Sequence, residues 1–229
     1  MIKNIAVFMI GFFLLSVPVV VLAEETPTAS GDTQVVAAVP EKFPRVIPLP
    51  LTDLLVPQII DYQIEYGDTL GNIARKFGTT VESITKINHL TTHAIYAGQK
   101  IRVWHESLTI SIDKSDNILI VKSGDQVIKQ YQVATGAANI TPVGEFTISS
   151  RIDHPTWFKK GEVILPDSPE NALGTRWLGF DKPQYGIHGT LHPELIGQQV
   201  SHGCVRMRNE DVEELFDYIA LGTKVNIQD

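Results

Sequence analysis

The sequence predicts two folded regions of different class. Residues 61–104 are expected to form a small α+β domain with the order strand, helix, helix, strand, and residues 105–229 a mostly β domain with one late helix. Three observations support this division. Apolar residues recur twice at helical spacing in the first region, alternate with polar residues at the start of the second, and return to helical spacing after residue 209.

The first 23 residues are predicted to be a secretory signal peptide. Lys3 precedes an uncharged stretch from Ile5 to Leu22, and Ala23 ends it as a small residue suited to cleavage. An uncleaved membrane anchor is the alternative, because this stretch approaches the length of about 17 to 25 residues that spans a bilayer. The residue directly after Ala23 is Glu24 and not cysteine, which excludes lipid attachment at that position. We therefore expect an exported protein.

Residues 24–60 are predicted to be an extended linker. They show no sustained helical or strand period and contain Pro27, Pro40, Pro44, Pro48, Pro50 and Pro57. Each proline removes a backbone donor and restricts φ, which disfavours a packed unit.

The α+β domain contains two short helical patterns between two strand patterns. The first helix has an apolar stripe at Leu70, Ile73, Ala74 and Phe77, and Gly78 is suited to a left-handed C-terminal cap. Thr79 and Glu82 are predicted to form a capping box for the second helix. Strands are expected at 62–65 and 100–104.

These elements, with YGDTL at the entry and IYAGQKI at the exit, resemble the LysM module. The resemblance implies binding to N-acetylglucosamine chains such as the peptidoglycan backbone. By the same resemblance, Gly67, Asp68, Thr69 and Asn88 are expected to contact the glycan.

The second domain begins with alternating residues that predict a meander of antiparallel strands. Strands are expected around Ile110, at 118–121 and at 127–133, with turns at 116–117 and 124–125. Asn209 is predicted to cap a helix that Gly222 ends, and 224–227 to form a last strand. The formal charge of −7 and the pI of about 5.5 argue against nucleic acid as a partner.

Cys204, in the stretch SHGCVRM, is the single cysteine of the chain. A cysteine nucleophile reacts as the thiolate and needs a base or a cation nearby. His202 is adjacent in sequence, and His188 in GIHGT lies 16 residues upstream. These patterns alone leave open which histidine is the base.

Two other interpretations of these residues were considered. His188, His192, His202 and Cys204 could supply four ligands to zinc, but Gly189 and Pro193 make a shared helix face for His188 and His192 improbable. We therefore expect no metal and no cofactor. A wall-binding protein that has lost its chemistry is the other alternative, and the presence of Cys204, His188 and Arg206 together argues against it.

The motifs IHGT and SHGCVRM, together with TPVGEF at 141–146, NALGTRWLGF at 171–180 and GTKVNI at 222–227, resemble the L,D-transpeptidase catalytic domain, also called the YkuD fold. The resemblance implies that Cys204 is the nucleophile, His188 the general base and the Gly189 carbonyl its orienting group. It also assigns Ser201, His202 and Gly203 to oxyanion or local support, and Arg206 to a substrate carboxylate.

For function, the resemblance implies an exported peptidoglycan enzyme of the periplasm or cell wall. The thiolate would attack the L-centre carbonyl of the third stem-peptide residue and release D-alanine. An amine of another stem peptide, or of an envelope lipoprotein, would accept the acyl group. Hydrolysis of the same acyl-enzyme and a non-catalytic binding role are the alternatives.

Overall fold

The computed structural model describes residues 59–159 and 161–229. The predicted signal peptide and nearly all of the predicted linker lie outside these residues. Within the described part of the chain, no helix is long and apolar enough to cross a membrane.

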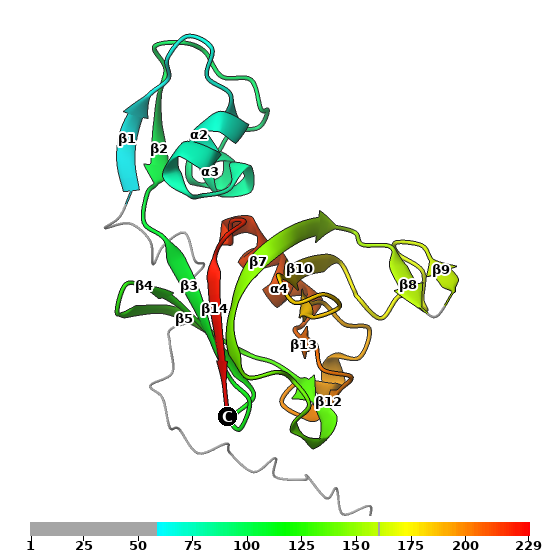
Figure 1. Cartoon of the computed structure of the whole chain (residues 1–229). Helices are drawn as coiled ribbons and strands as arrows, with labels where there is room; N and C mark the ends of the chain where they lie inside the picture. Colours follow the sequence, from blue (N-terminus) through cyan, green and yellow to red (C-terminus); the bar gives the residue numbers. More distant parts are fainter. Residues whose placement is uncertain (1–58, 160) are drawn as a thin grey trace, which may run out of the picture. The chain divides into compact units, whose positions relative to one another are not determined.

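The first domain has the predicted βααβ order, shown in Figure 1. Its elements are β1 (Ile59–Gln63), α2 (Leu70–Phe77), α3 (Val81–Ile87) and β2 (Lys100–Trp104). The two strands pair antiparallel, with Tyr62 opposite Ile101. The core is formed by Ile64, Leu70, Ile73, Ala74, Ile84, Ile101 and Val103. Two short helices on a two-stranded sheet are thus held mainly by apolar burial.

The helix caps of this domain confirm one expectation and correct another. Gly78 ends α2 with a φ of 65°, the left-handed conformation that glycine accepts without strain. The prediction that Thr79 caps α3 is wrong. Thr80 is the N-cap, in extended conformation, and its hydroxyl accepts a hydrogen bond from the Ser83 amide at 2.9 Å. A threonine pair precedes Val81, and the one adjacent to the first helical turn makes the cap.

The second domain is a curved sheet that packs on one helix. Its strands are β3 (Leu108–Asp113), β4 (Ile118–Ser123), β5 (Gln126–Gln132), β6 (Thr135–Gly136), β7 (Gly144–Asp153), β8 (Trp157–Lys159), β9 (Glu162–Ile164), β10 (Arg176–Phe180), β11 (Gly186–His188), β12 (Gln199–Ser201), β13 (Val205–Arg206) and β14 (Lys224–Gln228). The helix is α4 (Asn209–Tyr218), and the 3-10 turns are η2 (Ala137–Asn139) and η3 (Pro193–Leu195). The predicted meander β3–β4–β5 is confirmed.

Eight of these strands form one sheet in the order β13-β11-β10-β7-β14-β3-β4-β5. The last strand, β14, lies in its middle, parallel to β3 and antiparallel to β7. Beyond β5 the chain reaches the opposite edge, where Ala134 and Arg206 exchange backbone hydrogen bonds of 2.8 Å. The sheet therefore curls into a half-barrel whose two edges meet beside β13.

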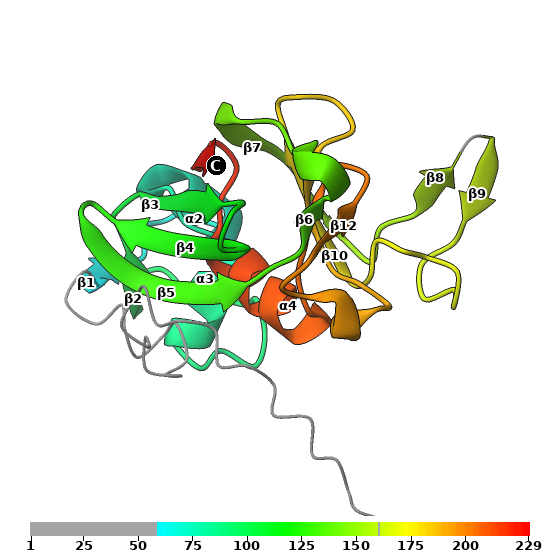
Figure 2. The ribbon, with the colours of Figure 1, turned by 90° about the horizontal axis from the view of Figure 1, so that it is seen from below.

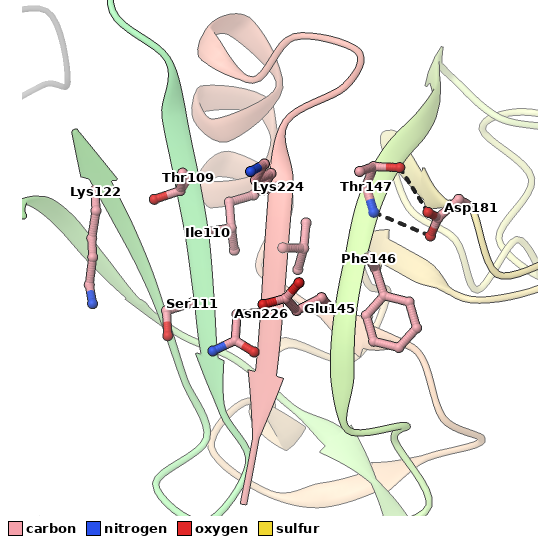
Figure 3. A pocket seen from close by; sticks show the side chains of 11 residues that line it. Thr109, Ile110, Ser111, Lys122, Glu145, Phe146, Thr147, Asp181, Lys224 and Asn226 are labelled. Atoms are coloured by element: carbon pink, nitrogen blue, oxygen red, sulfur yellow. Dashed lines mark hydrogen bonds between the residues drawn. The ribbon is translucent and has the colours of Figure 1, made fainter. Parts of the chain in front are cut away.

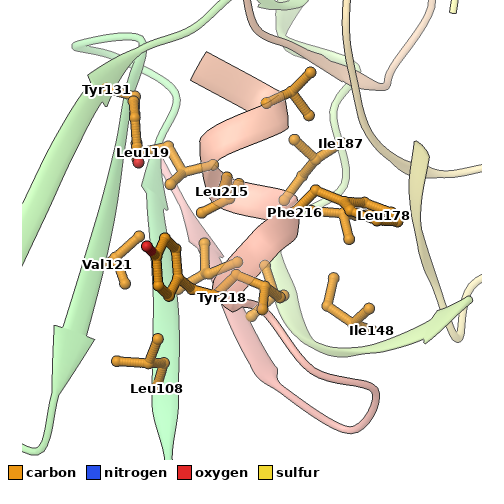
Figure 4. Close-up of a cluster of buried hydrophobic side chains, with 14 of the residues drawn as sticks. Leu108, Leu119, Val121, Tyr131, Ile148, Leu178, Ile187, Leu215, Phe216 and Tyr218 are labelled. Atoms are coloured by element: carbon orange, nitrogen blue, oxygen red, sulfur yellow. The ribbon is translucent and has the colours of Figure 1, made fainter. Parts of the chain in front are cut away.

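Helix α4 fills the concave side of this half-barrel. In Figure 4, Leu215 lies between Leu119 and Tyr131 on one side and Ile187 on the other. The helix begins at Asn209 and ends at Tyr218, with Arg208 as N-cap and Ile219 as C-cap. The predictions that Asn209 caps this helix and that Gly222 ends it are therefore wrong. The Asn209 side chain bonds to other loops instead, and Gly222 turns the chain into β14 with a φ of 83°.

The β8–β9 hairpin projects from the rest of the domain in Figures 1 and 2. Asn171 is buried at its base and donates to the carbonyls of Pro155, at 2.8 Å, and Leu165, at 3.1 Å. This single amide joins the residue stretch that precedes β8 to the one that follows β9. The NALG motif therefore has a structural role in holding the base of the hairpin.

Leu215→Ala is expected to destabilise the second domain strongly, because the side chain is fully buried between α4 and the sheet. Removing it should lower the free energy of unfolding by about 2 to 5 kcal/mol. Leu221→Ala is the matched control, since this leucine is 63% exposed and the same truncation there should change stability by no more than about 0.5 kcal/mol. Urea unfolding followed by tryptophan fluorescence measures both. Equal losses would contradict the packing of α4 described above.

Candidate active site

The candidate site is built on three adjacent strands, β10, β11 and β13. Trp177 is opposite His188 in the antiparallel pair β10–β11, and His188 is opposite Arg206 in the parallel pair β11–β13. Ile187 and Val205, which are also paired, both point into the core. Side chains alternate along a strand, so Trp177, His188 and Arg206 form a row on the other face.

A second row, displaced by two residues, carries the thiol. Gly179 is opposite Gly186, and the same register continued by one pair places Gly186 beside Cys204. Cys204 and Arg206 lie on one face of their strand, as do Gly186 and His188. The strand register therefore brings Cys204, His188 and Arg206 to one face.

Cys204 is half-buried and protonated at rest. Burial raises the pKa of its thiol, while the Gly186 amide and the Arg206 charge act in the opposite direction. The thiol donates to the carbonyl of Gln184 at 3.4 Å. The thiol of Cys204 is therefore neutral at rest, and a thiol acts as a nucleophile only where a base removes its proton.

His188 is only 3% exposed and has a defined tautomer. Its Nδ1 lies 2.7 Å from the Gly189 carbonyl, and since a carbonyl can only accept, Nδ1 carries the proton and Nε2 is the ring nitrogen that can accept one. Burial lowers the pKa of His188 to about 4; the Gly189 and Leu173 carbonyls oppose this shift and the Arg206 charge adds to it. The imidazole is therefore neutral over the physiological range, as a general base must be.

Trp177 covers one face of the His188 ring. The two rings are stacked with centroids 5.8 Å apart and an interplanar angle of 23°. Glycines make room for the indole: a Cβ at Gly179 would lie 2.6 Å from Trp177 Nε1, and one at Gly186 2.9 Å from its Cζ2. The indole contributes to the burial that keeps the imidazole neutral.

The turn that carries Cys204 is held by Ser201 and by Tyr185. Ser201 Oγ accepts from the Gly203 amide at 3.0 Å and donates to the Cys204 carbonyl at 2.5 Å. Gly203 has a φ of 118°, and a Cβ there would lie 2.7 Å from the Tyr185 ring, so no other residue fits without rearrangement. In this conformation the Gly203 amide is bonded within the turn, and its part in holding an oxyanion stays a prediction.

Arg206 has the features of an anion-binding residue. Its Nε is buried and has no hydrogen-bond partner among the described residues. A buried guanidinium donor without an acceptor costs free energy that a ligand carboxylate could recover. Its position beside His188 agrees with the predicted contact to a substrate carboxylate.

The other two histidines named from the sequence differ from His188 in burial, and the support predicted for His202 stays a prediction. His202 is exposed, and His192, also exposed, has its Nδ1 3.2 Å from a carboxylate oxygen of Glu194 at the η3 turn. Across residues 59–159 and 161–229, no group of three or more acidic, histidine or cysteine side chains is arranged to hold a metal ion.

The four residues predicted to contact glycan are engaged within the first domain. Thr69 caps α2, and Asp68 accepts from Tyr62 Oη and the Glu65 amide, each at 2.8 Å. Asn88 joins α3 to β2 through hydrogen bonds with the Arg102 backbone at 2.7 Å. Gly67 has a φ of 89°. Their contact with glycan stays a prediction, and all four have an evident structural role.

A groove of about 440 Å³ lies on the outer face of the sheet, away from Cys204. In Figure 3 its side chains come from β3, β4, β14 and β7, with Thr147 donating to Asp181 at one end. None of the residues of the IHGT and SHGCVRM motifs lines it. The candidate site is therefore identified by the chemistry of its side chains and not by the size of a cavity.

Comparison with known proteins agrees with this chemistry. The model of the YkuD family, described as the L,D-transpeptidase catalytic domain, matches residues 107–227, and the LysM model matches residues 62–104. The chain is 32% identical to a Bacillus subtilis protein named as the L,D-transpeptidase YkuD, over 74% of this chain and 99% of that protein. The chain belongs to the L,D-transpeptidase family.

Other relatives carry the same family name. The B. subtilis protein named as the L,D-transpeptidase YqjB is 42% identical over 52% of this chain and 70% of its own length. A solved L,D-transpeptidase from Mycobacterium smegmatis aligns at 16% identity and a TM-score of 0.44, over 58% of this chain and 64% of its own. One from Mycobacterium tuberculosis H37Rv aligns at 13% identity and a TM-score of 0.47, over 75% and 90% of the two chains.

Two features of the candidate site were not predicted from the sequence motifs. The stacking of Trp177 on His188 depends on strand register, and a tryptophan in NALGTRWLGF carries no local sign of its partner. Asn209 was predicted as a helix cap, yet its Oδ1 accepts from the amides of Thr190, at 3.1 Å, and Thr175, at 3.4 Å. The available signal was an asparagine two residues after the SHGCVRM segment.

The buried neutral His188 predicts a specific dependence of stability on pH. The folded chain takes up this proton near pH 4 and the unfolded chain near pH 6.5, so acidification through this interval favours unfolding. The contribution of the neutral His188 to the free energy of unfolding should be complete above pH 6.5 and should fall by about 3 kcal/mol by pH 4. Urea unfolding of the parent and of His188→Gln at several pH values measures the difference. An identical pH dependence in both proteins would contradict a buried neutral imidazole.

Proposed function

We propose that this chain is a peptidoglycan L,D-transpeptidase that acts through an acyl-enzyme on Cys204. The observation that carries the proposal is the placement of a thiol, a neutral imidazole and a guanidinium with a buried, unpartnered Nε on one face of adjacent strands, in a chain of this family. The thiol supplies the nucleophile, the imidazole the base, and the guanidinium an anchor for a substrate carboxylate.

The first half of the reaction follows from the protonation states. Substrate binding brings the L-centre carbonyl of the third stem-peptide residue to Cys204. Nε2 of His188 removes the thiol proton as sulfur attacks, and backbone amides of the 202–204 turn stabilise the oxyanion. When the tetrahedral intermediate collapses, the bond to D-alanine breaks and the new imidazolium gives its proton to the departing amine. A thioester on Cys204 remains.

In the second half of the reaction, the same proton transfers run in reverse, and an acceptor amine takes the place of D-alanine. An amine of another stem peptide, or of an envelope lipoprotein, attacks the thioester while His188 accepts its proton, and the thiol leaves reprotonated. Water as acceptor would give carboxypeptidase activity instead. No metal or cofactor takes part in these steps. Peptidoglycan, the proposed substrate, lies outside the cytoplasm, in agreement with the predicted signal peptide and with an envelope location.

Tetrapeptide muropeptides provide the direct test of this proposal. The parent should release D-alanine and form 3→3 dimers or hydrolysed tripeptides, which mass spectrometry separates, and Cys204→Ala should form none of them. A carbapenem should add its mass to the parent and not to the variant. Product formation by Cys204→Ala at the parental rate would overturn the mechanism. An unmodified parent with intact folding would favour the non-catalytic alternative.

The LysM domain would hold the glycan chains of the same polymer. Two tyrosines are unusually exposed at its loops, Tyr66 at 99% and Tyr96 at 72%. Such rings offer flat apolar faces with a polar edge, and these faces suit stacking against sugar rings.

Tyr66→Ala and Tyr96→Ala are each expected to weaken binding to purified peptidoglycan by about five- to tenfold, about 1 to 1.4 kcal/mol. Tyr66→Phe and Tyr96→Phe keep the ring and should bind within about twofold of the parent. Sedimentation with peptidoglycan measures the bound fraction at each concentration. Parental binding by both alanine variants would exclude these rings from the glycan contact.

A further inference from the structure

Asn209 is connected to the general base through one peptide group. Its Oδ1 accepts a hydrogen bond from the Thr190 amide at 3.1 Å. The peptide group that contains this N–H also contains the Gly189 carbonyl, which lies 2.7 Å from Nδ1 of His188. A trans peptide is planar, with its C=O and N–H directed to opposite sides. Fixing the N–H therefore fixes the direction of the carbonyl.

The surroundings of Asn209 Oδ1 are shaped to hold it in this position. The same oxygen accepts from the Thr175 amide at 3.4 Å, which ties the loop before β10 to the loop after β11. A Cβ at Gly174 would lie 2.3 Å from this oxygen, and one at Gly189 would lie 2.2 Å from it. Both loops thus carry glycine where the asparagine side chain enters.

The position of Asn209 is set by a helix that is anchored in the core. It is the first residue of α4, and the next turns of that helix bury Val212 and Leu215 completely. A side chain on such a helix loses little precision to backbone motion. The helix N-cap is Arg208 and makes no side-chain capping bond, so the asparagine amide is used across the loops and not for its own helix.

We propose that Asn209 is a positioning residue for catalysis: its Oδ1 fixes the Gly189–Thr190 peptide group, whose carbonyl orients the His188 imidazole toward Cys204. A hydrogen bond accepted from the N–H also polarises the peptide, which makes its carbonyl a better acceptor. The inference rests on the proposed role of His188 as base. It adds the Asn209 side chain to the Gly189 carbonyl as a group that determines the orientation of the imidazole.

The test compares Asn209→Leu with Asn209→Asp in the full chain. Leucine has similar size and no acceptor, whereas aspartate keeps an oxygen for both amides and is favourable in the first turn of a helix. Acylation of Cys204 by a carbapenem should slow about ten- to hundredfold in Asn209→Leu, as expected for a misplaced catalytic group. Asn209→Asp should remain within about threefold of the parent. Asn226→Leu, on the outer face of the sheet, is the matched control and should not change the rate.

Nitrogen NMR of His188 separates positioning from a purely structural role. In the parent, Nδ1 should be the protonated nitrogen, and in Asn209→Leu the two tautomers should mix while the Thr190 amide loses protection from hydrogen exchange. Asn209→Ala gives the same comparison where the leucine variant fails to fold. Parental His188 signals and a parental acylation rate in a folded Asn209→Leu or Asn209→Ala would overturn the proposal.

The NMR comparison does not depend on turnover. A parent that is not acylated, with His188 tautomers that still respond to Asn209, would count against the proposed function alone. A parent that is acylated normally, with tautomers that ignore Asn209, would count against the positioning role alone.

Discussion

The parallel pairing of β11 with β13 is the constraint on which the rest of the site depends. Only two residue pairs define it, Ile187 with Val205 and His188 with Arg206. A shift by one residue would turn every side chain to the opposite face and bury the thiol in the core. The register is held from both sides, by β10 next to β11 and by the backbone bonds between Ala134 and Arg206. Ile187 and Val205 add apolar burial that a shifted register would lose.

This register also determines the electrostatic character of the site. His188 is almost completely buried and Cys204 is half-buried, and burial shifts their pKa values in the directions that keep both neutral. An ion pair at rest would have to recover the desolvation of two charges, which costs several kcal/mol for each. A neutral pair avoids this cost. In the proposed reaction, charges form only during attack, and the low-dielectric surroundings would then strengthen the interactions with the Gly186 amide and Arg206.

The cost of burying a charge also explains why a backbone carbonyl, and not a carboxylate, accepts the hydrogen bond from His188 Nδ1. A third ionised side chain behind His188 would be buried next to a ring that is itself almost completely buried. The Gly189 carbonyl supplies a hydrogen-bond acceptor without a net charge to desolvate. A carbonyl on a loop is a precise acceptor only where its peptide plane is held, and the Asn209 amide contacts that plane from the other side. Glycine at 174 and 189 is the requirement that this arrangement places on the sequence.

By itself the sequence determined the elements whose signals are local. The two LysM helices, the Gly78 cap and the meander β3–β4–β5 follow from periodicity and turn residues, which act over a few neighbouring positions. The single thiol and its motif were likewise evident, and the choice of His188 over His202 came from resemblance. Local patterns did not distinguish Thr79 from Thr80 as the N-cap of α3, because the cap is the threonine that directly precedes the first helical turn.

Only the tertiary structure decided what depends on pairing between distant segments. The last strand lies in the middle of the sheet, Trp177 and Arg206 flank His188 through strand register, and Asn209 joins two loops. Side-chain alternation says which residues share a face of one strand, but it does not say which strand lies next to it. That choice is made by burial of the whole core around α4, so the neighbours of His188 could not be predicted from its own segment.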